Sequence, residues 1–88
     1  MTKQILENEI CYLDDDGRKL AFVSFAKEGD VLNIDKTMVD PSLKGQGIAK
    51  RLMEDIHSFA KDNGLKLKAT CSFAISYFEK NPSVLYLK

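Results

Sequence analysis

The chain has 88 residues, which is room for one small domain (1–88), and its 44% hydrophobic and 30% charged residues are typical of a globular protein. Thirteen basic residues balance thirteen acidic ones, so the net charge offers no general attraction to nucleic acid or to anionic lipid. No segment approaches the roughly 20 apolar residues of a membrane span, and the N-terminus lacks the apolar core of a signal peptide. Two cysteines and one histidine are too few for a disulfide framework or a structural metal site. We therefore expect a cytoplasmic domain that uses no metal, nucleic acid or membrane.

Three strands are expected in the first half of the chain. Residues 10–13 form a short apolar run that ends at the turn-forming residues 14–17. Residues 19–27 carry apolar groups on both alternating faces, which favours a central strand. A short turn at 28–30 leads into a third strand at 31–39. Because the connections are short, the three strands are predicted to form an antiparallel meander.

The hydrophobic period changes in the second half of the chain. Apolar residues at spacings of three and four predict an amphipathic helix over 48–62, which an Asn-Gly pair ends. Residues 65–71 alternate as a fourth strand, and residues 72–80 predict a short second helix before an Asn-Pro pair. Residues 83–88 have the composition of a last edge strand.

This order of elements predicts an α+β fold with a mixed sheet. The fourth strand should join the meander in parallel through a right-handed helix crossover. A crossover of this kind places the carboxyl ends of the third and fourth strands, Val39 and Cys71, at the same edge of the sheet. Ligands bind outside such strand ends. We therefore expect Cys71 and the segment after Val39 to share one site.

Two glycines in that segment, Gly45 and Gly47, stand where the helix should begin. Glycine costs about 1 kcal/mol against alanine inside a helix. In one interpretation Ser42 caps a helix that begins at the next residue, and the glycines are only tolerated. In the other, open N–H groups and the helix dipole bind an anion, and Lys44 and Lys50 add positive charge beside it.

The pattern of residues narrows the choice of anion. The phosphate loop of nucleotide triphosphatases is absent, and Lys50 stands where the dinucleotide pattern needs its third glycine. The stretch resembles the pyrophosphate-binding motif [QR]-x-x-G-x-[GA] of the GNAT superfamily of N-acetyltransferases. The matching residues are Lys44, Gly45, Gln46, Gly47, Ile48 and Ala49. Lys44 replaces the usual Arg or Gln, and lysine lacks the planar fork of arginine that makes bidentate contacts.

A second stretch, CSFAISYFEKNP at 71–82, resembles the signature of the small, single-domain YjdJ-type branch of that superfamily. The two resemblances together cover about residues 31–82. They imply a minimal GNAT-like acyltransferase fold and acetyl-coenzyme A (acetyl-CoA) as donor substrate. They also imply that loop amides hold the pyrophosphate, that the third strand pairs with the pantetheine arm, and that the Val39 amide stabilises the oxyanion. The implied binding residues are Met38, Val39, Lys44, Gly45, Gln46, Gly47, Ile48, Ala49 and Lys50.

The second stretch departs from the superfamily at its general acid. The superfamily often has N-x-x-A-x-x-x-Y, whose tyrosine protonates the departing CoA thiolate. With Ala74 at the alanine, Phe78 falls at the tyrosine and Cys71 at the asparagine, while Tyr77 points elsewhere on the helix. Cys71 then has two interpretations. It is a reactive thiol whose pKa a helix N-terminus lowers, or it is a small buried hydrophobe.

Three other residues are weaker candidates. His57 is expected at the boundary of the long helix or in solvent, and Cys11 in the core. Lys36 stands where relatives of this branch often carry a histidine, so a family role for that histidine does not transfer to this chain.

These observations predict an acetyl-CoA-dependent N-acetyltransferase that acts on an amine of a small molecule or on a protein lysine, with Cys71 as the catalytic candidate. The alternative is a module or sensor that binds acetyl-CoA or CoA without turnover, since Phe78 cannot act as the acid. A third possibility is an interaction domain without a ligand. The sequence identifies neither the amine acceptor nor the oligomeric state, monomer or weak dimer.

Overall fold

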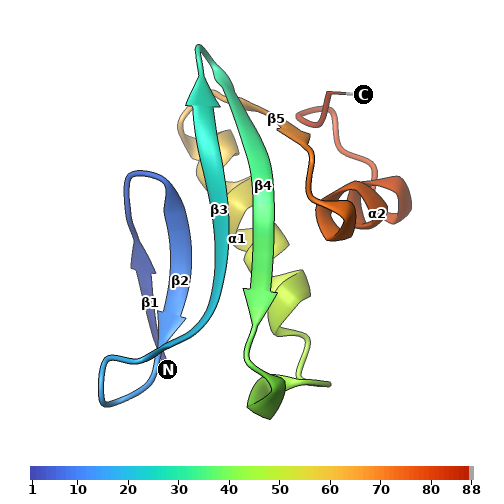
Figure 1. The fold of residues 1–88 in the computed structure, drawn as a ribbon. Coiled ribbons are helices and arrows are strands. Elements are labelled where there is room, and N and C mark those ends of the chain that lie inside the picture. The colour runs from blue at the N-terminus through green and yellow to red at the C-terminus, as the bar shows by residue number, and fades with distance from the viewer. Residues whose placement is uncertain (88) are drawn as a thin grey trace.

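The computed structural model describes residues 1–87 and shows a five-stranded sheet with two α-helices (Figure 1). The strands lie in the order of the chain, β1 to β5. The first four are antiparallel, and β5 runs parallel to β4 after the crossover through α1. The α+β class and the mixed sheet are therefore confirmed. The elements are β1 (Thr2–Ile5), β2 (Glu9–Leu13), β3 (Lys19–Glu28), β4 (Val31–Val39), the 3-10 turn η1 (Pro41–Leu43), α1 (Ile48–Asp62), β5 (Lys66–Ala69) and α2 (Ser72–Lys80).

The two ends of the chain differ from expectation. Strand β1 was not predicted, because all of its residues are exposed and show none of the alternation that marks a half-buried strand. Its backbone pairs with β2 instead, from Thr2 opposite Leu13 to Ile5 opposite Ile10. The predicted edge strand at 83–88 is wrong for the described residues. Only an isolated bridge joins this segment to the sheet, and Lys88 lies outside the described residues.

Helix α1 covers one face of the sheet and forms the core with it. The predicted apolar stripe of α1 is buried against residues of β2, β3, β4 and β5 that point to the same face. Phe59 of α1 lies against Phe25 of β3, with ring centroids 5.9 Å apart. The buried residues of α1 are Ile48, Leu52, Met53, Ile56 and Ala60. Cys11 is buried as expected.

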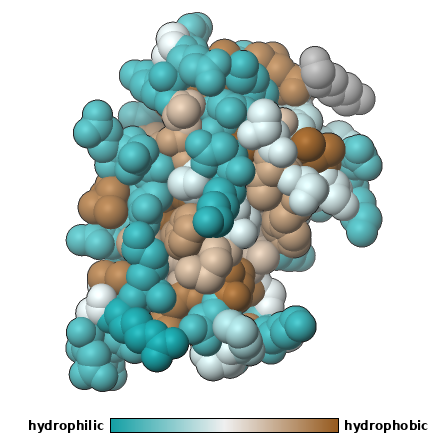
Figure 2. Space-filling view, in the orientation of Figure 1, coloured by the Kyte–Doolittle hydropathy of each residue, from teal (hydrophilic) through white to brown (hydrophobic). Residues whose placement is uncertain are grey.

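The other face of the sheet has no helix over it, and Figures 1 and 2 are viewed from this side. Phe22 in the middle of this face is only partly buried, and Met38 opposite it is exposed. Figure 2 shows hydrophobic side chains here between hydrophilic ones. The ammonium groups of Lys19 and Lys36 lie 5.2 and 5.9 Å from the centre of the Phe22 ring. The apolar residues on both faces of β3 therefore reflect its central position, and the structure covers only one of these faces.

Strand β5 pairs with only the first half of β4. The pairing runs from Val31 opposite Lys66 to Ile34 opposite Ala69. The pairing ends at a bulge in β4, which is the place where Asp35 has no partner residue on β3. The second half of β4 therefore has an open edge on the side that faces α2, and its chain continues into η1 and the glycine loop (Figure 1).

Within residues 1–87, neither α1 nor α2 is long and apolar enough to cross a membrane.

Candidate active site

The glycine loop lies between η1 and α1, and its glycines are not inside a helix. Helix α1 begins at Ile48, so the interpretation of a helix that starts near Ser42 is wrong. Gly45 and Gly47 have φ of 83° and 70°, in the left-handed region that other residues adopt at a cost. A Cβ at either position would meet no atom within 4 Å. The glycines are therefore needed for backbone conformation, and the space beside them is open.

The loop leaves a row of backbone N–H groups free. Gly47 caps α1 with its backbone alone, since no side chain caps the helix. The first helical hydrogen bond runs from Arg51 N to Gly47 O, at 3.0 Å. Among residues 1–87 no acceptor is found for the N–H groups of Gly45, Gly47 and the first three residues of α1. These groups and the helix dipole give the loop a local positive potential that suits an anion.

The side chains around the loop are arranged in keeping with this potential. Ile48 is 4% exposed, so its side chain anchors the start of α1 in the core while its N–H stays free. Lys44 and Lys50 are exposed, and neither forms an ion pair with any described residue. Gln46 differs from its neighbours, because its N–H donates to Leu43 O at 3.2 Å.

The open edge of β4 leads from the loop toward α2. Asp40 N donates to Leu20 O on β3 at 2.7 Å. Because backbone groups alternate in direction along a strand, the N–H and C=O groups of Val39 and Thr37 point away from β3. They face the edge that β5 leaves unpaired. The predicted binding residues Met38 and Val39 thus lie beside backbone groups that can pair with an extended ligand.

Cys71 lies at the start of α2, beside the middle of β4. Its N–H donates to Ile34 O at 3.2 Å, and its sulfur lies 3.4 Å from the hydroxyl oxygen of Thr37. The side chain is half-buried. The sulfur faces the open edge of β4.

The surroundings of Cys71 hold the pKa of its thiol below the ordinary value. Burial acts to raise this pKa, and the Thr37 hydroxyl and the N–H groups of Ala74 and Phe73 outweigh it. The sulfur makes no full capping hydrogen bond, so these N–H groups act as nearby dipoles. Thr37 was not singled out in the sequence. Only a register for the pairing of β4 and β5 would have placed it beside Cys71.

The two motifs lie along one edge but not side by side. Strand β5 is shorter than the predicted strand 65–71, and Cys71 is held at Ile34 rather than at Val39. Ile34 and Val39 are five residues apart, which is roughly 16 Å along an extended strand. The sequence predicted that the two motifs meet at one place, at the ends of the strands. In the structure they are spread along β4 instead, with Cys71 at one end and the glycine loop at the other.

The aromatic residues Tyr77 and Phe78 of α2 pack against one another and against the C-terminal segment. Phe78 is 4% exposed and stacks on Tyr86, with ring centroids 4.5 Å apart. Tyr77 packs edge-on against Phe78, and burial and the nearby Glu54 carboxylate raise its pKa. His57 is half-buried, and its Nε2 lies 2.7 Å from Ser83 Oγ, so it joins α1 to the C-terminal segment. None of these residues reaches the Cys71 sulfur in the contacts described.

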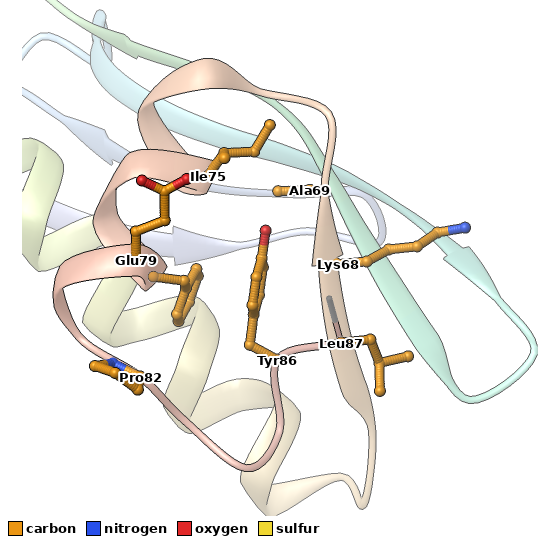
Figure 3. A pocket seen from close by; sticks show the side chains of 8 residues that line it. Lys68, Ala69, Ile75, Glu79, Pro82, Tyr86 and Leu87 are labelled. Atoms are coloured by element: carbon orange, nitrogen blue, oxygen red, sulfur yellow. The ribbon is translucent and has the colours of Figure 1, made fainter.

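A hollow in the surface lies elsewhere. It has a volume of about 810 Å³ and lies on the outer side of β5, between α2 and the C-terminal segment (Figure 3). It contains none of the predicted site residues. Its lining residues are Lys68, Ala69, Ile75, Phe78, Glu79, Pro82, Tyr86 and Leu87. Over residues 1–87, no three His, Cys, Asp or Glu side chains gather in a way that could hold a metal ion.

Comparisons with known proteins agree with this fold. The profile of the GCN5-related N-acetyltransferase family matches residues 10–87. A GCN5-like protein from Staphylococcus aureus, described as an N-acetyltransferase and solved by NMR, is 35% identical with a TM-score of 0.80, over 98% of this chain and 87% of that one. A Bacillus cereus acetyltransferase is 25% identical with a TM-score of 0.66, over 83% of this chain and 54% of that one.

The fold is also similar to that of YhbS, an N-acetyltransferase from Escherichia coli whose crystal structure contains CoA. The identity is 21% and the TM-score 0.60, over 68% of this chain and 37% of that one. At this identity the likeness concerns the fold. No curated protein sequence matches the chain.

Proposed function

Because the chain belongs to the GCN5-related N-acetyltransferase family, we propose that it transfers the acetyl group of acetyl-CoA to an amine, of a small molecule or of a protein lysine. The observation that carries this proposal is the row of free N–H groups of Gly45, Gly47 and the first three residues of α1, at the end of a strand whose edge is open. An anion at the loop and an extended chain along β4 are what acetyl-CoA would supply there.

The length of the open edge suits the donor. Loop amides hold the pyrophosphate, with Lys44 and Lys50 adding charge. The pantetheine arm then runs along Val39 and Thr37, whose outward backbone groups pair with its amides. This arm is about as long as four extended residues. Its sulfur end therefore reaches the neighbourhood of Cys71. The Cys71 N–H is held at Ile34, roughly 16 Å from Val39 along the strand, and the Cys71 sulfur lies beside Thr37, roughly 7 Å from Val39.

Bound at this edge, acetyl-CoA supplies an activated acyl group, and the chain supplies donors around it. The family resemblance implies that the Val39 N–H stabilises the oxyanion, but in this pose that N–H pairs with the pantetheine arm and lies away from the thioester. Cys71 and Thr37 carry the exchangeable protons nearest the edge, since Phe78 has no hydroxyl and lies in the core. We assign the catalytic role to Cys71, and Thr37 is its hydrogen-bonding partner.

Two routes use the same thiol. In direct transfer the neutral amine attacks the thioester carbon, and the Cys71 thiol protonates the departing CoA thiolate. The nitrogen of the new amide loses its proton, which returns Cys71 to the thiol form. In covalent transfer the Cys71 thiolate attacks the thioester carbon and CoA leaves as a thiolate. The amine then attacks the S-acetyl group, loses a proton and regenerates Cys71. The lowered pKa of Cys71 favours the thiolate that the second route needs.

The test combines a binding and a transfer measurement. CoA is titrated by calorimetry, and the protein is then incubated with acetyl-CoA and a panel of amines while free CoA thiol is measured. We expect binding, together with CoA release that depends on the amine. Binding without release for any amine would favour a CoA-binding module, which the missing tyrosine at Phe78 makes the second candidate. No binding would refute both.

Cys71→Ala separates the two routes. In the covalent route, the intact mass of the wild type shows an acetyl adduct that Cys71→Ala lacks, and peptide mapping places it on Cys71 rather than on a lysine. In the direct route no adduct forms, but Cys71→Ala is slow. The matched control is Cys11→Ala, since Cys11 is buried on β2 and should leave the adduct unchanged. Full activity of Cys71→Ala would refute a role for the thiol.

A further inference from the structure

We propose that Asp40 is a positioning residue for the glycine loop, and that Arg18 cancels its charge. Asp40 directly follows β4 and precedes η1, so it stands where the chain leaves the sheet toward the loop. The inference rests on the proposed function, because the loop matters there as the seat of the pyrophosphate. Asp40 itself needs no contact with the ligand.

The backbone and side chain of Asp40 tie the loop to the sheet. Its N–H donates to Leu20 O on β3 at 2.7 Å. Its carboxylate accepts from Ser42 N, and its C=O accepts from Leu43 N, both at 2.9 Å. Leu43 O in turn accepts from Gln46 N, the residue between the two glycines. A continuous series of hydrogen bonds thus runs from β3 through Asp40 to the middle of the loop.

Few other contacts hold this segment. Residues 41–43 include no fully buried side chain, and Leu43 is only partly packed on the core. The loop has no side-chain cap at α1 either. Because buried side chains contribute little to the stability of this segment, the Asp40 carboxylate is the main group that holds the chain between β4 and Ile48 in place.

A carboxylate near an anion site carries an electrostatic cost, and Arg18 offsets it. Arg18 Nη2 lies 2.9 Å from Asp40 Oδ2. The backbone N–H of Arg18 donates to the carboxylate of Asp14 at 2.9 Å, which fixes the turn that presents the guanidinium. The Arg18 side chain is 67% exposed, so this pair adds little to stability. Its effect is on the potential that an incoming diphosphate meets.

Three variants test the role of Asp40. Asp40→Ala removes the capping acceptor, and Asp40→Asn keeps an acceptor of equal capping quality while removing the charge. The matched control is Asn63→Ala. Asn63 donates to Phe59 O at 2.8 Å at the far end of α1, so this variant loses one side-chain–backbone hydrogen bond away from the loop. The readouts are 15N relaxation of the Gly45 and Gly47 amides in the free protein, the Kd for CoA, and kcat against KM.

We expect Asp40→Ala to lower the order parameters of the two glycine amides and to raise the Kd for CoA about fivefold, the factor that one capping hydrogen bond is worth. The KM for acetyl-CoA should rise with kcat nearly unchanged. Asp40→Asn should restore both the order and the affinity. Asn63→Ala should lower the Tm without changing either.

A further variant keeps the inference testable if Asp40→Ala does not fold. Arg18→Gln leaves the Asp40 cap intact but leaves the charge of the Asp40 carboxylate unpaired. This variant should therefore raise the Kd for CoA more at low than at high salt. Unchanged glycine order parameters and Kd in Asp40→Ala, equal changes in Asn63→Ala, or an unchanged Kd in Arg18→Gln would overturn the inference. If the wild type binds no CoA, the proposed function fails. The relaxation data still decide whether Asp40 holds the loop.

Discussion

The glycine pair Gly47 and Gly29 offers a matched test of the loop. Both residues have left-handed backbones, with φ of 70° and 65°, and a Cβ at either would meet no atom within 4 Å. They differ in place, since Gly29 lies in the turn between β3 and β4 and Gly47 precedes α1. Substitution by alanine therefore introduces the same backbone strain at two different places, one of them in the anion-binding loop.

The size of the effect follows from that strain. A left-handed alanine costs about 1–2 kcal/mol, and the entropy that alanine removes from the unfolded chain is the same at both sites. Each variant should therefore lose about 1 kcal/mol of unfolding free energy, or about 4–8 °C in Tm. In the free Gly47→Ala protein the loop should relax to a less strained backbone conformation. CoA binding must then restore the left-handed conformation, which costs free energy of binding. We expect that variant to raise the Kd for CoA about fivefold or more, and Gly29→Ala to leave it unchanged.

The assay is calorimetric titration with CoA, together with thermal unfolding of each variant without ligand. Equal losses of Tm show that the two substitutions are matched. The reasoning would be refuted if Gly47→Ala bound CoA as tightly as Gly29→Ala does, because the free N–H groups around Gly47 would then not hold the pyrophosphate.

Two further predictions concern the thiol and the core. Thr37→Val removes the hydroxyl that helps to lower the pKa of Cys71, so the midpoint of thiol alkylation against pH should move to higher pH. Thr70→Val is its control, because Thr70 directly precedes Cys71 but is exposed, and its hydroxyl is not among the groups that lower the pKa of Cys71. An unshifted midpoint in Thr37→Val would show that the Thr37 hydroxyl does not act on the sulfur. Leu52→Ala opens a cavity under the sheet at a fully buried residue and should lower the unfolding free energy by about 2–5 kcal/mol in denaturant titration. A loss under 1 kcal/mol would contradict the packing of α1 on the sheet.

The long periodic elements could be predicted from the sequence, because their burial is regular. Helix α1 begins and ends as predicted, since the apolar spacing from Ile48 onward and the Asn-Gly stop both reflect its packing. Strand β1 could not be predicted, because backbone pairing and not burial defines it. The segment 83–87 has strand-like composition, but it makes only one bridge to Leu67.

The site was predictable in its parts and not in its spacing. Left-handed glycines and free amides follow from the motif around Gly45 and Gly47, which is local. The place of Cys71 depends on the register of β5 and on the bulge at Asp35, and neither leaves a mark in the nearby sequence. The same register brings Thr37 to the sulfur. The tie between Arg18 and Asp40 joins residues 22 positions apart, so it also needed the fold.

The central claim is that the loop N–H groups bind the pyrophosphate of acetyl-CoA, and one NMR titration tests it directly. CoA is added to 15N-labelled protein while the backbone amide signals are followed. The largest shifts are predicted at Gly45, Gly47 and Ile48, with smaller ones along Thr37 and Val39 on the open edge of β4. Shifts confined to the hollow beside β5, or none at saturating CoA, would contradict it.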